Sequence, residues 1–340
     1  MHDLDFDTTA FGRWLAGQTG QEAVLAFEPI PGGASCELFR MTRLGVRWII
    51  RRAPKVAVAS SAHNVLREAR IIRALHGSAL PVPAVLACSD DCGLLGAPFF
   101  IMEYLDGEVL RRELPRSYLD HPATQRAVGE ELVDRLADLH AFDWKHSAIA
   151  ELARPEGFLA RQVERWMSQL SQYRTRELPG IDEVAQWLED HLPPGGDLVV
   201  MHGDYKLDNV IFSRSAPPRI LGLLDFEMTT VGDPLIDLAW AMIFWPGEGN
   251  LIAFPGVGVP GGFDAAFCQA PQQLVQRYAQ RTGRDMGHLQ WYQAFSAWKL
   301  AIVLEGSYVK HLEGVSKNPS HRYLGFTIEQ LLARARRFAA

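Results

Sequence analysis

The stretch MHGDYKLDNVIF, residues 201–212, decides the fold because it places a dense group of polar side chains between two apolar ends. One His, two Asp, one Lys and one Asn fall within residues 202–209. The stretch is too polar for a buried strand, and its apolar flanks are unusual for a surface loop. We therefore interpret it as a functional loop held between two short strand-like arms.

The spacing of Asp204, Lys206 and Asn209 suits phosphoryl transfer. That reaction needs a carboxylate facing the acceptor hydroxyl, oxygen ligands for Mg²⁺, and cations beside the phosphate oxygens. One short loop supplies all three kinds of group. Downstream, the apolar run ILGLL ends in Asp225, and a buried strand that delivers a carboxylate at its end holds a metal ligand rigidly.

The first hundred residues read as strands with one helix among them. Apolar runs on either side of RLGVR, residues 43–47, predict a hairpin that turns at Gly45. Residues 61–77 predict a helix with Gly77 as its C-cap, and residues 81–107 predict two short strands around an acidic turn. The apolar stripe of that helix is formed by Val65, Ala69, Ile72 and His76.

After residue 107 the apolar spacing becomes helical, and short strands return only between residues 197 and 227. The predicted fold class is α+β with two lobes. Residues 1–103 form a small antiparallel-sheet lobe with one main helix, and residues 104–340 form a larger, mostly helical lobe. This order does not fit a Rossmann sheet or a TIM barrel, which need regular βα alternation. The Pro- and Gly-rich residues 254–263 are the best candidate for a mobile loop.

Composition narrows the class of partner. The chain has 340 residues, 48% of them hydrophobic, and a net charge of −6, which argues against broad binding to nucleic acid or to anionic membranes. No apolar run approaches the length of a membrane span. The four cysteines show no metal-binding spacing and no secretion signal precedes them, so we expect a cytoplasmic protein with free thiols. No feature specifies an oligomeric state.

HGDYKLDN, followed by LLDFE and then VGDPLIDLAW, resembles the aminoglycoside phosphotransferase family of the protein-kinase-like fold. The segments RRAP, SAHNVLREARIIRAL, PVPAVLA and FFIMEYLDG are similar to the kinase domain of the acyl-CoA dehydrogenase fusion proteins. The resemblance runs from about residue 30 to about residue 308. It implies a two-lobed kinase-like fold in which residues 1–103 bind nucleotide and residues 104–340 carry catalysis and substrate binding.

The family pattern also implies roles for the loop residues. Asp204 would be the catalytic carboxylate that faces a small-molecule hydroxyl, and Lys206 would neutralise charge on the transferring phosphoryl group. Asn209 and Asp225 would ligate Mg²⁺. Asp237, a lone acid in an apolar helical run, would accept backbone N–H groups of the catalytic loop.

The remaining implied roles concern ATP. Glu68 would pair with a cation at the end of the third strand. Backbone groups of Glu103 and Leu105 would bond the adenine, because IMEYLDG matches the hinge between the lobes. The turn PGGAS, residues 31–35, would cover the phosphates through Gly32, Gly33 and Ser35.

Three positions depart from the general kinase pattern. The third strand ends in WIIRR, so Arg51 or Arg52 stands where kinases have Lys, and the sequence leaves both open. The nucleotide turn has two glycines in place of the fuller GxGxxG. In DFE, Glu227 takes the position of a Gly, which makes a kinase-type flip of this loop unfavourable and adds an acid near the metal ligand.

Other polar residues favour structural roles. We expect Asp208 to be a solvated loop charge, His202 to support the loop by hydrogen bonding, and Asp233 to cap the following helix. We expect His140 to be packed structurally and not to act in catalysis.

The acceptor stays open between several classes. Aromatic residues are frequent after Trp240, and residues 246–308 contain only four acids, Glu248, Asp264, Asp285 and Glu305. Because a polycationic aminoglycoside would be expected to meet clustered carboxylates, the composition favours a hydroxy acid or hydroxyacyl compound. The alternatives are phosphorylation of an aminoglycoside or another antibiotic, and a nucleotide-binding regulator with little transfer. A protein kinase is disfavoured because VGDPLIDLAW follows Asp225 almost at once, with no activation loop. Preference between ATP and GTP is also open.

Overall fold

The computed structural model describes residues 4–31, 36–55, 60–110, 114–119, 122–154, 156–245, 268–316 and 318–340. The chain packs into two compact units. The sheet unit consists of Met1–Gly107, Trp144–Glu151 and Leu221–Thr229, and the helical unit consists of Glu108–Asp143, Leu152–Ile220 and Thr230–Ala340. The functional division at residue 103 stays a prediction.

The sheet unit is built on five antiparallel strands in the order β1-β2-β3-β5-β4. Their bounds are β1 Leu25–Ile30, β2 Glu37–Arg43, β3 Val46–Arg52, β4 Val85–Ser89 and β5 Phe99–Glu103. The hairpin predicted at Gly45 is confirmed: Leu44 and Gly45 both have positive φ, at 52° and 76°, and two such residues match the right-handed strand twist.

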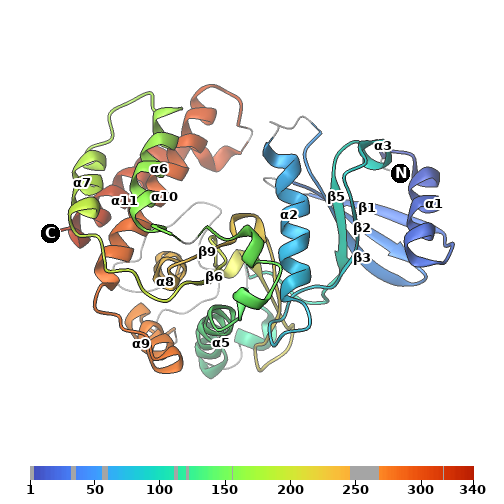
Figure 1. Ribbon diagram of the computed structural model, residues 1–340, viewed down its shortest axis with the longest axis horizontal. Helices are drawn as coiled ribbons and strands as arrows, with labels where there is room; N and C mark the ends of the chain where they lie inside the picture. The colour runs from blue at the N-terminus through green and yellow to red at the C-terminus, as the bar shows by residue number, and fades with distance from the viewer. Residues whose placement is uncertain are drawn as a thin grey trace. The chain divides into compact units, whose positions relative to one another are not determined.

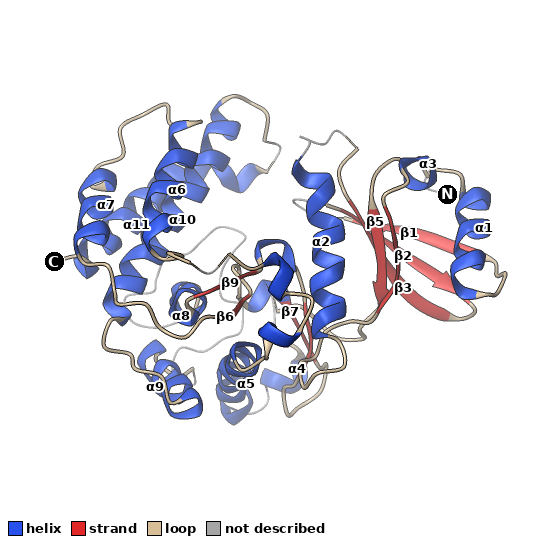
Figure 2. Ribbon diagram, in the orientation of Figure 1, coloured by secondary structure: helices blue, strands red, loops and turns tan. Residues whose placement is uncertain are grey.

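Helices α1 (Thr8–Thr19) and α2 (Ser60–Leu75) cover opposite faces of this sheet (Figure 2). Phe11 and Leu15 of α1 pack with Phe39, Ile50 and Phe99 in one buried cluster. The prediction of a single helix in this region was therefore wrong. A third, short helix, α3 (Cys92–Leu95), also occupies the place of the predicted acidic turn, with Asp91 as its N-cap.

The helix predicted at 61–77 is confirmed as α2, with one correction. Val65, Ala69 and Ile72 are buried, and Gly77 has a φ of 85°, which suits the end of a helix. His76, however, is exposed. The helix ends at Leu75, so His76 leaves the apolar stripe because it lies beyond the last turn.

The helical unit is arranged around α10 (Leu289–Leu312), which packs against α6, α7, α8 and α11 (Figure 1). Trp291 and Trp298 of α10 donate from Nε1 to the carbonyls of Leu188 and Ile181, both at 2.9 Å, and so attach α10 to α7. The other helices of this unit are α4 Arg116–Leu119, α5 Pro122–His140, α6 Ala160–Ser171, α7 Ile181–Asp190, α8 Pro234–Ile243, α9 Pro271–Thr282 and α11 Leu324–Phe338.

Short strands frame the loops that carry the candidate site. In the helical unit, β6 (Val199–Met201) pairs antiparallel with β9 (Thr230–Gly232), and β7 (Val210–Phe212) follows the 202–209 loop. Strand β8 (Ile220–Leu223) leads into the 3-10 turn η4 (Phe226–Met228) of the sheet unit. The short strands predicted between residues 197 and 227 are therefore confirmed.

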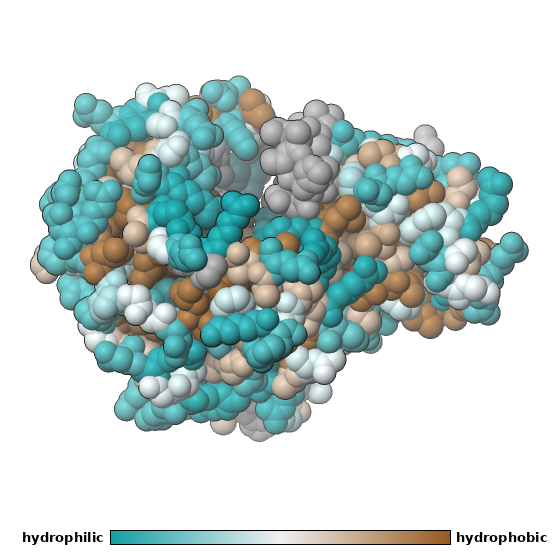
Figure 3. Space-filling view, viewed as in Figure 1, coloured by the Kyte–Doolittle hydropathy of each residue, from teal (hydrophilic) through white to brown (hydrophobic). Residues whose placement is uncertain are grey.

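Hydrophilic residues cover most of the face seen in Figure 3, with hydrophobic residues between them. Within the described part of the chain, no helix is both long and apolar enough to cross a bilayer.

Candidate active site

The loop 202–209 is held by a carboxylate buried beneath it. Asp237 of α8 accepts the backbone N–H groups of His202 and Gly203 at 2.6 and 2.8 Å, which confirms its predicted role. Gly203 has a φ of 86°, a conformation that other residues rarely adopt. A glycine and a buried acceptor therefore fix the entry into the loop at Asp204.

Asp204 receives hydrogen bonds from three side chains. Lys206 Nζ lies 2.8 and 2.7 Å from its two carboxylate oxygens, Asn209 Nδ2 donates to Oδ2 at 2.9 Å, and Trp240 Nε1 donates to Oδ1 at 2.8 Å. Burial would raise the pKa of Asp204, but Lys206, Trp240 and His202 hold the pKa below its ordinary value. The carboxylate is thus ionised and fixed in orientation.

Asn209 braces the loop from its far end. Its Nδ2 also donates to the backbone carbonyl of Asp204 at 2.8 Å, so the amide oxygen is directed to the other side of the side chain. Asp204, Lys206 and Asn209 are therefore brought together in one loop, as the sequence spacing predicted.

A buried chain of polar groups supports Asp237. His140 of α5 lies 3.4 Å from Asp237 through Nε2, and its Nδ1 lies 2.6 Å from the hydroxyl of Tyr278. Burial lowers the pKa of His140, while burial would raise the pKa of Asp237 but His140 and the loop N–H groups hold it below its ordinary value. A neutral imidazole beside an ionised carboxylate agrees with the structural role predicted for His140.

The sheet unit assembles a second charged cluster around Arg51. Arg51 Nε forms an ion pair with Glu68 of α2 at 2.7 Å, and its Nη2 lies 2.8 Å from Asp225 and 3.3 Å from Glu227. Burial alone would lower the pKa of Arg51, but the three carboxylates raise it. Burial raises the pKa of Glu68, and Arg51 opposes that shift.

Arg52 faces away from this cluster because neighbouring residues of a strand point to opposite faces. Its guanidinium lies 2.8 Å from Asp5 and 2.5 Å from Glu37, and it also donates to the Leu95 carbonyl at 2.7 Å. Of the two arginines left open by the sequence, Arg51 is the one that pairs with Glu68.

Asp225 is held in a strained backbone conformation. Its φ is 64°, an uncommon value for a residue other than Gly and one that tends to mark functional sites. The next N–H, of Phe226, donates to Glu68 at 3.2 Å, and Arg67 of α2 donates to the carbonyls of Glu227 and Thr229. Helix α2 thus fixes the turn that presents Asp225.

Comparison with known proteins decides the family. The model of the phosphotransferase enzyme family, APH, matches residues 26–285. The chain belongs to this family. Its fold is kinase-like, with an N-terminal five-stranded antiparallel sheet followed by a mostly helical part, and the predicted resemblance and fold class are confirmed.

Relatives of this APH-family chain include longer proteins. It is 30% identical over 324 residues to acyl-CoA dehydrogenase family member 11 of Gallus gallus, covering 92% of this chain and 40% of that protein. It is 29% identical over 298 residues to acyl-CoA dehydrogenase family member 10 of Mus musculus, covering 86% and 27%. The chain therefore spans less than half the length of these relatives.

Solved structures of similar fold include aminoglycoside phosphotransferases. A Ralstonia eutropha JMP134 protein assigned to the aminoglycoside phosphotransferases matches with a TM-score of 0.81 and 28% identity, covering 98% of this chain and 99% of that one. Aminoglycoside phosphotransferase APH(4)-Ia, in complex with ADP and hygromycin B, matches with a TM-score of 0.61 over 95% and 98% of the two chains. At 13% identity, this second match shows the fold alone.

Glu103 and Leu105, the residues predicted to bond the adenine, lie at the end of β5 and just after it. The Glu103 N–H donates to the Ala84 carbonyl at 2.8 Å, and the Leu105 carbonyl accepts from the Gly107 N–H at 3.0 Å. Leu105 also packs closely on β8, because a Cβ placed on Gly222 would lie 2.1 Å from Leu105 Cδ1. Gly32, Gly33 and Ser35, which are predicted to cover the phosphates, and the predicted mobile loop 254–263 lie outside the described residues.

Of the residues predicted to have structural roles, His202 and Asp233 have the contacts expected of them. His202 is buried, and its Nδ1 lies 3.4 Å from the Asp204 N–H, as expected of a supporting group. Asp233 caps α8 through the Leu235 N–H at 2.9 Å and also accepts from Tyr292. Asp208 is partly exposed, and its role stays a prediction.

The sequence analysis missed two side chains of the site, Trp240 and Lys299. Trp240 lies in an aromatic-rich part of the chain, so its residue type alone did not distinguish it. Among these aromatic residues, the buried lobe core contains Trp245, Trp291, Tyr292, Phe295 and Trp298. The position of Trp240 three residues after Asp237 on α8 places it on the same helix face. Lys299 is a lone charge in the apolar run WKLAIVL, the same signal that identified Asp237.

Proposed function

We propose that this chain is an ATP- and Mg²⁺-dependent kinase that transfers the γ-phosphoryl group of ATP to a hydroxyl of a small molecule. The observation that carries the proposal is the Asp204 carboxylate, which accepts hydrogen bonds from Lys206, Asn209 and Trp240. Lys206 and Trp240 also hold its pKa below the ordinary value. A fixed carboxylate of this kind orients an acceptor hydroxyl and takes up its proton.

The side-chain types proposed as magnesium ligands suit that ion. Asn209 and Asp225 offer an amide and a carboxylate oxygen, the hard ligands that Mg²⁺ takes alongside phosphate oxygens and water. Within the described residues no group of three or more His, Cys, Asp or Glu side chains could hold a metal, and kinase Mg²⁺ sites do not need one because phosphates complete the shell. A bound ion would supply positive charge beside the phosphates.

ATP is proposed to meet the sheet unit. Arg51, held by Glu68, supplies the cation for phosphate in place of the usual lysine. The adenine contacts are the Glu103 carbonyl and the Leu105 N–H, since the other backbone groups of these residues bond Ala84 and Gly107. Gly32, Gly33 and Ser35 cover the phosphates in this proposal. Lys206 adds a second cation, on the catalytic loop.

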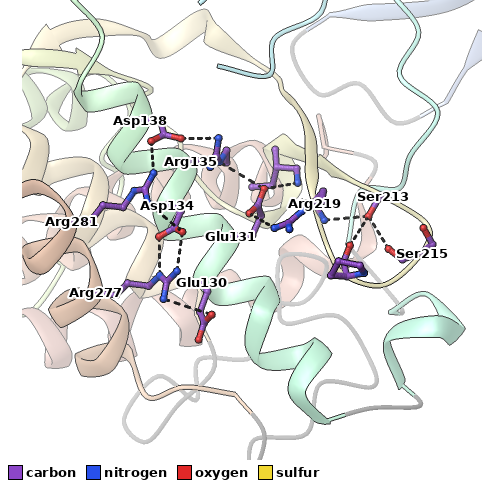
Figure 4. Close-up of polar contacts among 12 residues, drawn as sticks. Glu130, Glu131, Asp134, Arg135, Asp138, Ser213, Ser215, Arg219, Arg277 and Arg281 are labelled. Carbon is purple, nitrogen blue, oxygen red and sulfur yellow. Dashed lines mark hydrogen bonds and ion pairs between the residues drawn. The ribbon is translucent and has the colours of Figure 1, made fainter. Parts of the chain in front are cut away.

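A hydroxy acid or hydroxyacyl compound is the acceptor we favour. The acids Glu131, Asp134 and Asp138 of α5 are held by Arg135, Arg219, Arg277 and Arg281 (Figure 4). Glu305 is likewise paired with Arg176 at 2.8 Å. These carboxylates are committed to arginines and are poorly suited to bind a polycation. The names of the relatives, acyl-CoA dehydrogenase family members 10 and 11, support an acyl-type acceptor.

The test is a screen for acceptor-dependent ADP formation over hydroxy acids, hydroxyacyl thioesters, sugars, choline-like alcohols and aminoglycosides. We expect turnover with an acceptor of the first two classes. Turnover with aminoglycosides alone would contradict the favoured acceptor. If no acceptor supports turnover while ATP with Mg²⁺ still raises the melting temperature, the chain is a nucleotide-binding regulator and the proposed function is wrong.

A further inference from the structure

Lys299 is a buried cation that the proposed mechanism does not use. It lies on α10, with 6% of the residue exposed. Within the described part of the chain it makes no ion pair; its Nζ donates to the Gly203 carbonyl at 3.4 Å. Burying an ammonium group without a carboxylate partner is costly, so its presence calls for a role.

Two indole rings surround the ammonium group. Lys299 Nζ lies 4.1 Å from the centre of the Trp240 ring and 5.1 Å from that of Trp166 on α6. A cation over the face of a Trp ring is attracted by the ring, more strongly when both are out of water. Lys299 thus contacts two residues that are joined directly to Asp204. Trp240 donates a hydrogen bond to the Asp204 carboxylate, and Gly203, whose carbonyl accepts from Lys299, precedes Asp204 in the chain.

We infer that Lys299 is a positioning residue that holds the Trp240 indole in place as a donor to the Asp204 carboxylate. This inference rests on the proposed function, because the orientation of Asp204 matters for catalysis only if Asp204 faces the acceptor hydroxyl. With the cation present, the indole is fixed on its face by Lys299 and at its N–H by Asp204. Without it, Trp240 can turn away, and Asp204 keeps Lys206 and Asn209 as its side-chain donors among the described residues.

The charge on Lys299 depends on pH in an accessible range. Burial lowers its pKa to about 8, although Asp204 and Asp237 act in the opposite direction; Arg165 and Lys206 lower it further. The ammonium form is therefore present at neutral pH and is lost as the pH rises through about 8. The contact with Trp240 weakens over the same interval, since a neutral amine has little attraction for the ring.

The first test observes Trp240 without relying on activity. The indole N–H signals of ¹⁵N-labelled protein are followed by NMR from pH 6.5 to 9.5, and the Trp240 signal is identified by its loss in Trp240→Phe. We expect it to shift with a midpoint near pH 8 in the unaltered chain and in Lys310→Met, an exposed control on the same helix. In Lys299→Met the signal should be displaced and the titration lost.

The second test uses the acceptor found by the screen. Lys299→Met should lower kcat about tenfold with the KM for ATP unchanged, Lys299→Arg should recover part of the loss because it keeps a cation over the ring, and Lys310→Met should have no effect. If Lys299→Met leaves both the Trp240 signal and kcat as they were, the inference is wrong. Absence of any turnover in the unaltered chain overturns the proposed function instead, and the Trp240 titration still decides whether Lys299 holds the indole.

Discussion

At the scale of the residue, two carboxylates of the helical unit, Asp204 and Asp237, organise the 202–209 loop. Asp204 has donors on both carboxylate oxygens, and Asp237 binds two consecutive backbone N–H groups of the same loop. The first carboxylate is partly accessible, with its side chain 25% exposed, whereas the second is fully buried. Accessibility separates the group that can meet a substrate from the group that can only hold the loop.

At the same scale, the burial of Lys299 predicts how its substitution changes the free energy of unfolding. In the unfolded chain a lysine keeps its proton up to its ordinary pKa of 10.5, but in the folded chain the pKa is about 8. Below pH 8 the folded state carries the cost of a buried cation, so Lys299→Met should raise the free energy of unfolding at pH 7 by about 1 to 2 kcal/mol.

The direction in which stability changes with pH follows from how many protons the folded and unfolded chains bind. Between pH 8 and 10.5 the unfolded chain binds more protons than the folded one, so the stability of the unaltered chain rises with pH relative to Lys299→Met. Urea unfolding at pH 7 and pH 9.5 measures both effects. If the difference in free energy of unfolding between the unaltered chain and Lys299→Met is larger at pH 9.5 than at pH 7, the buried-cation account is contradicted.

At the scale of the element, α8 carries two residues that support the 202–209 loop, Asp237 and Trp240. Asp233 begins the helix, Asp237 binds the loop, and Trp240 reaches Asp204. Residues three and four apart lie on one side of a helix, so a single rigid element positions all of these contacts.

Removing Asp237 should destabilise this element strongly. Asp237→Ala leaves two buried N–H groups and His140 without their acceptor, and we expect a loss of about 3 to 5 kcal/mol. Asp182→Ala, at an exposed acid of α7, should change stability by less than about 0.5 kcal/mol. The midpoints of urea unfolding compare the two variants; equal midpoints would refute the bracing role.

Substitution of two helical glycines by alanine should change the stability of the protein in opposite directions. A Cβ on Gly129 of α5 would lie 2.7 Å from the buried Trp245 ring, whereas a Cβ on Gly17 of α1 meets nothing within 4 Å. Gly17→Ala should stabilise the protein by about 0.5 to 1 kcal/mol through helix propensity. Gly129→Ala should destabilise it by about 1 to 3 kcal/mol, because the indole has to move.

Thermal unfolding of both glycine variants checks this pair. Stabilisation of both would show that Trp245 yields without cost, and destabilisation of both would show that α1 does not follow the propensity expected of a helix.

At the scale of the whole molecule, the proposed contacts of Arg51, Glu103 and Leu105 with ATP lie in the sheet unit, and the proposed catalytic carboxylate lies in the helical unit. Binding and chemistry should therefore be separable by substitution. Arg51→Met alone would leave Glu68 buried without its cation, so the variant of choice is Arg51→Met with Glu68→Gln. It should weaken ATP binding about tenfold through the lost charge–phosphate contact, whereas Asp204→Asn should bind ATP normally.

Calorimetric titration of ATP with Mg²⁺ into each protein measures this separation. ATP binding that is unchanged in the Arg51→Met, Glu68→Gln variant would remove Arg51 from the nucleotide site.

Local spacing predicted much of the site and of the fold. Asp204, Lys206 and Asn209 lie in one loop, so their offsets predicted their meeting, and a lone acid in an apolar run revealed Asp237. The contacts of Trp240 and Lys299 depend on tertiary packing of α8 and α10, which no local pattern encodes. Helix α1 was not predicted because its twelve residues include Gly12 and Gly17, which lower helix propensity. Strand alternation alone could not choose between Arg51 and Arg52 until α2 was placed on one face of the sheet.

The central claim is that Asp204 carries phosphoryl transfer to a small-molecule hydroxyl. The most direct measurement follows the γ-phosphoryl group of ATP onto the acceptor by ³¹P NMR, comparing the unaltered chain with Asp204→Asn and with Asp182→Asn, a control at an exposed acid. The account predicts phosphorylated acceptor with the unaltered chain and the control, and a rate at least about 10²-fold lower with Asp204→Asn. Transfer by Asp204→Asn at the rate of the unaltered chain would contradict it.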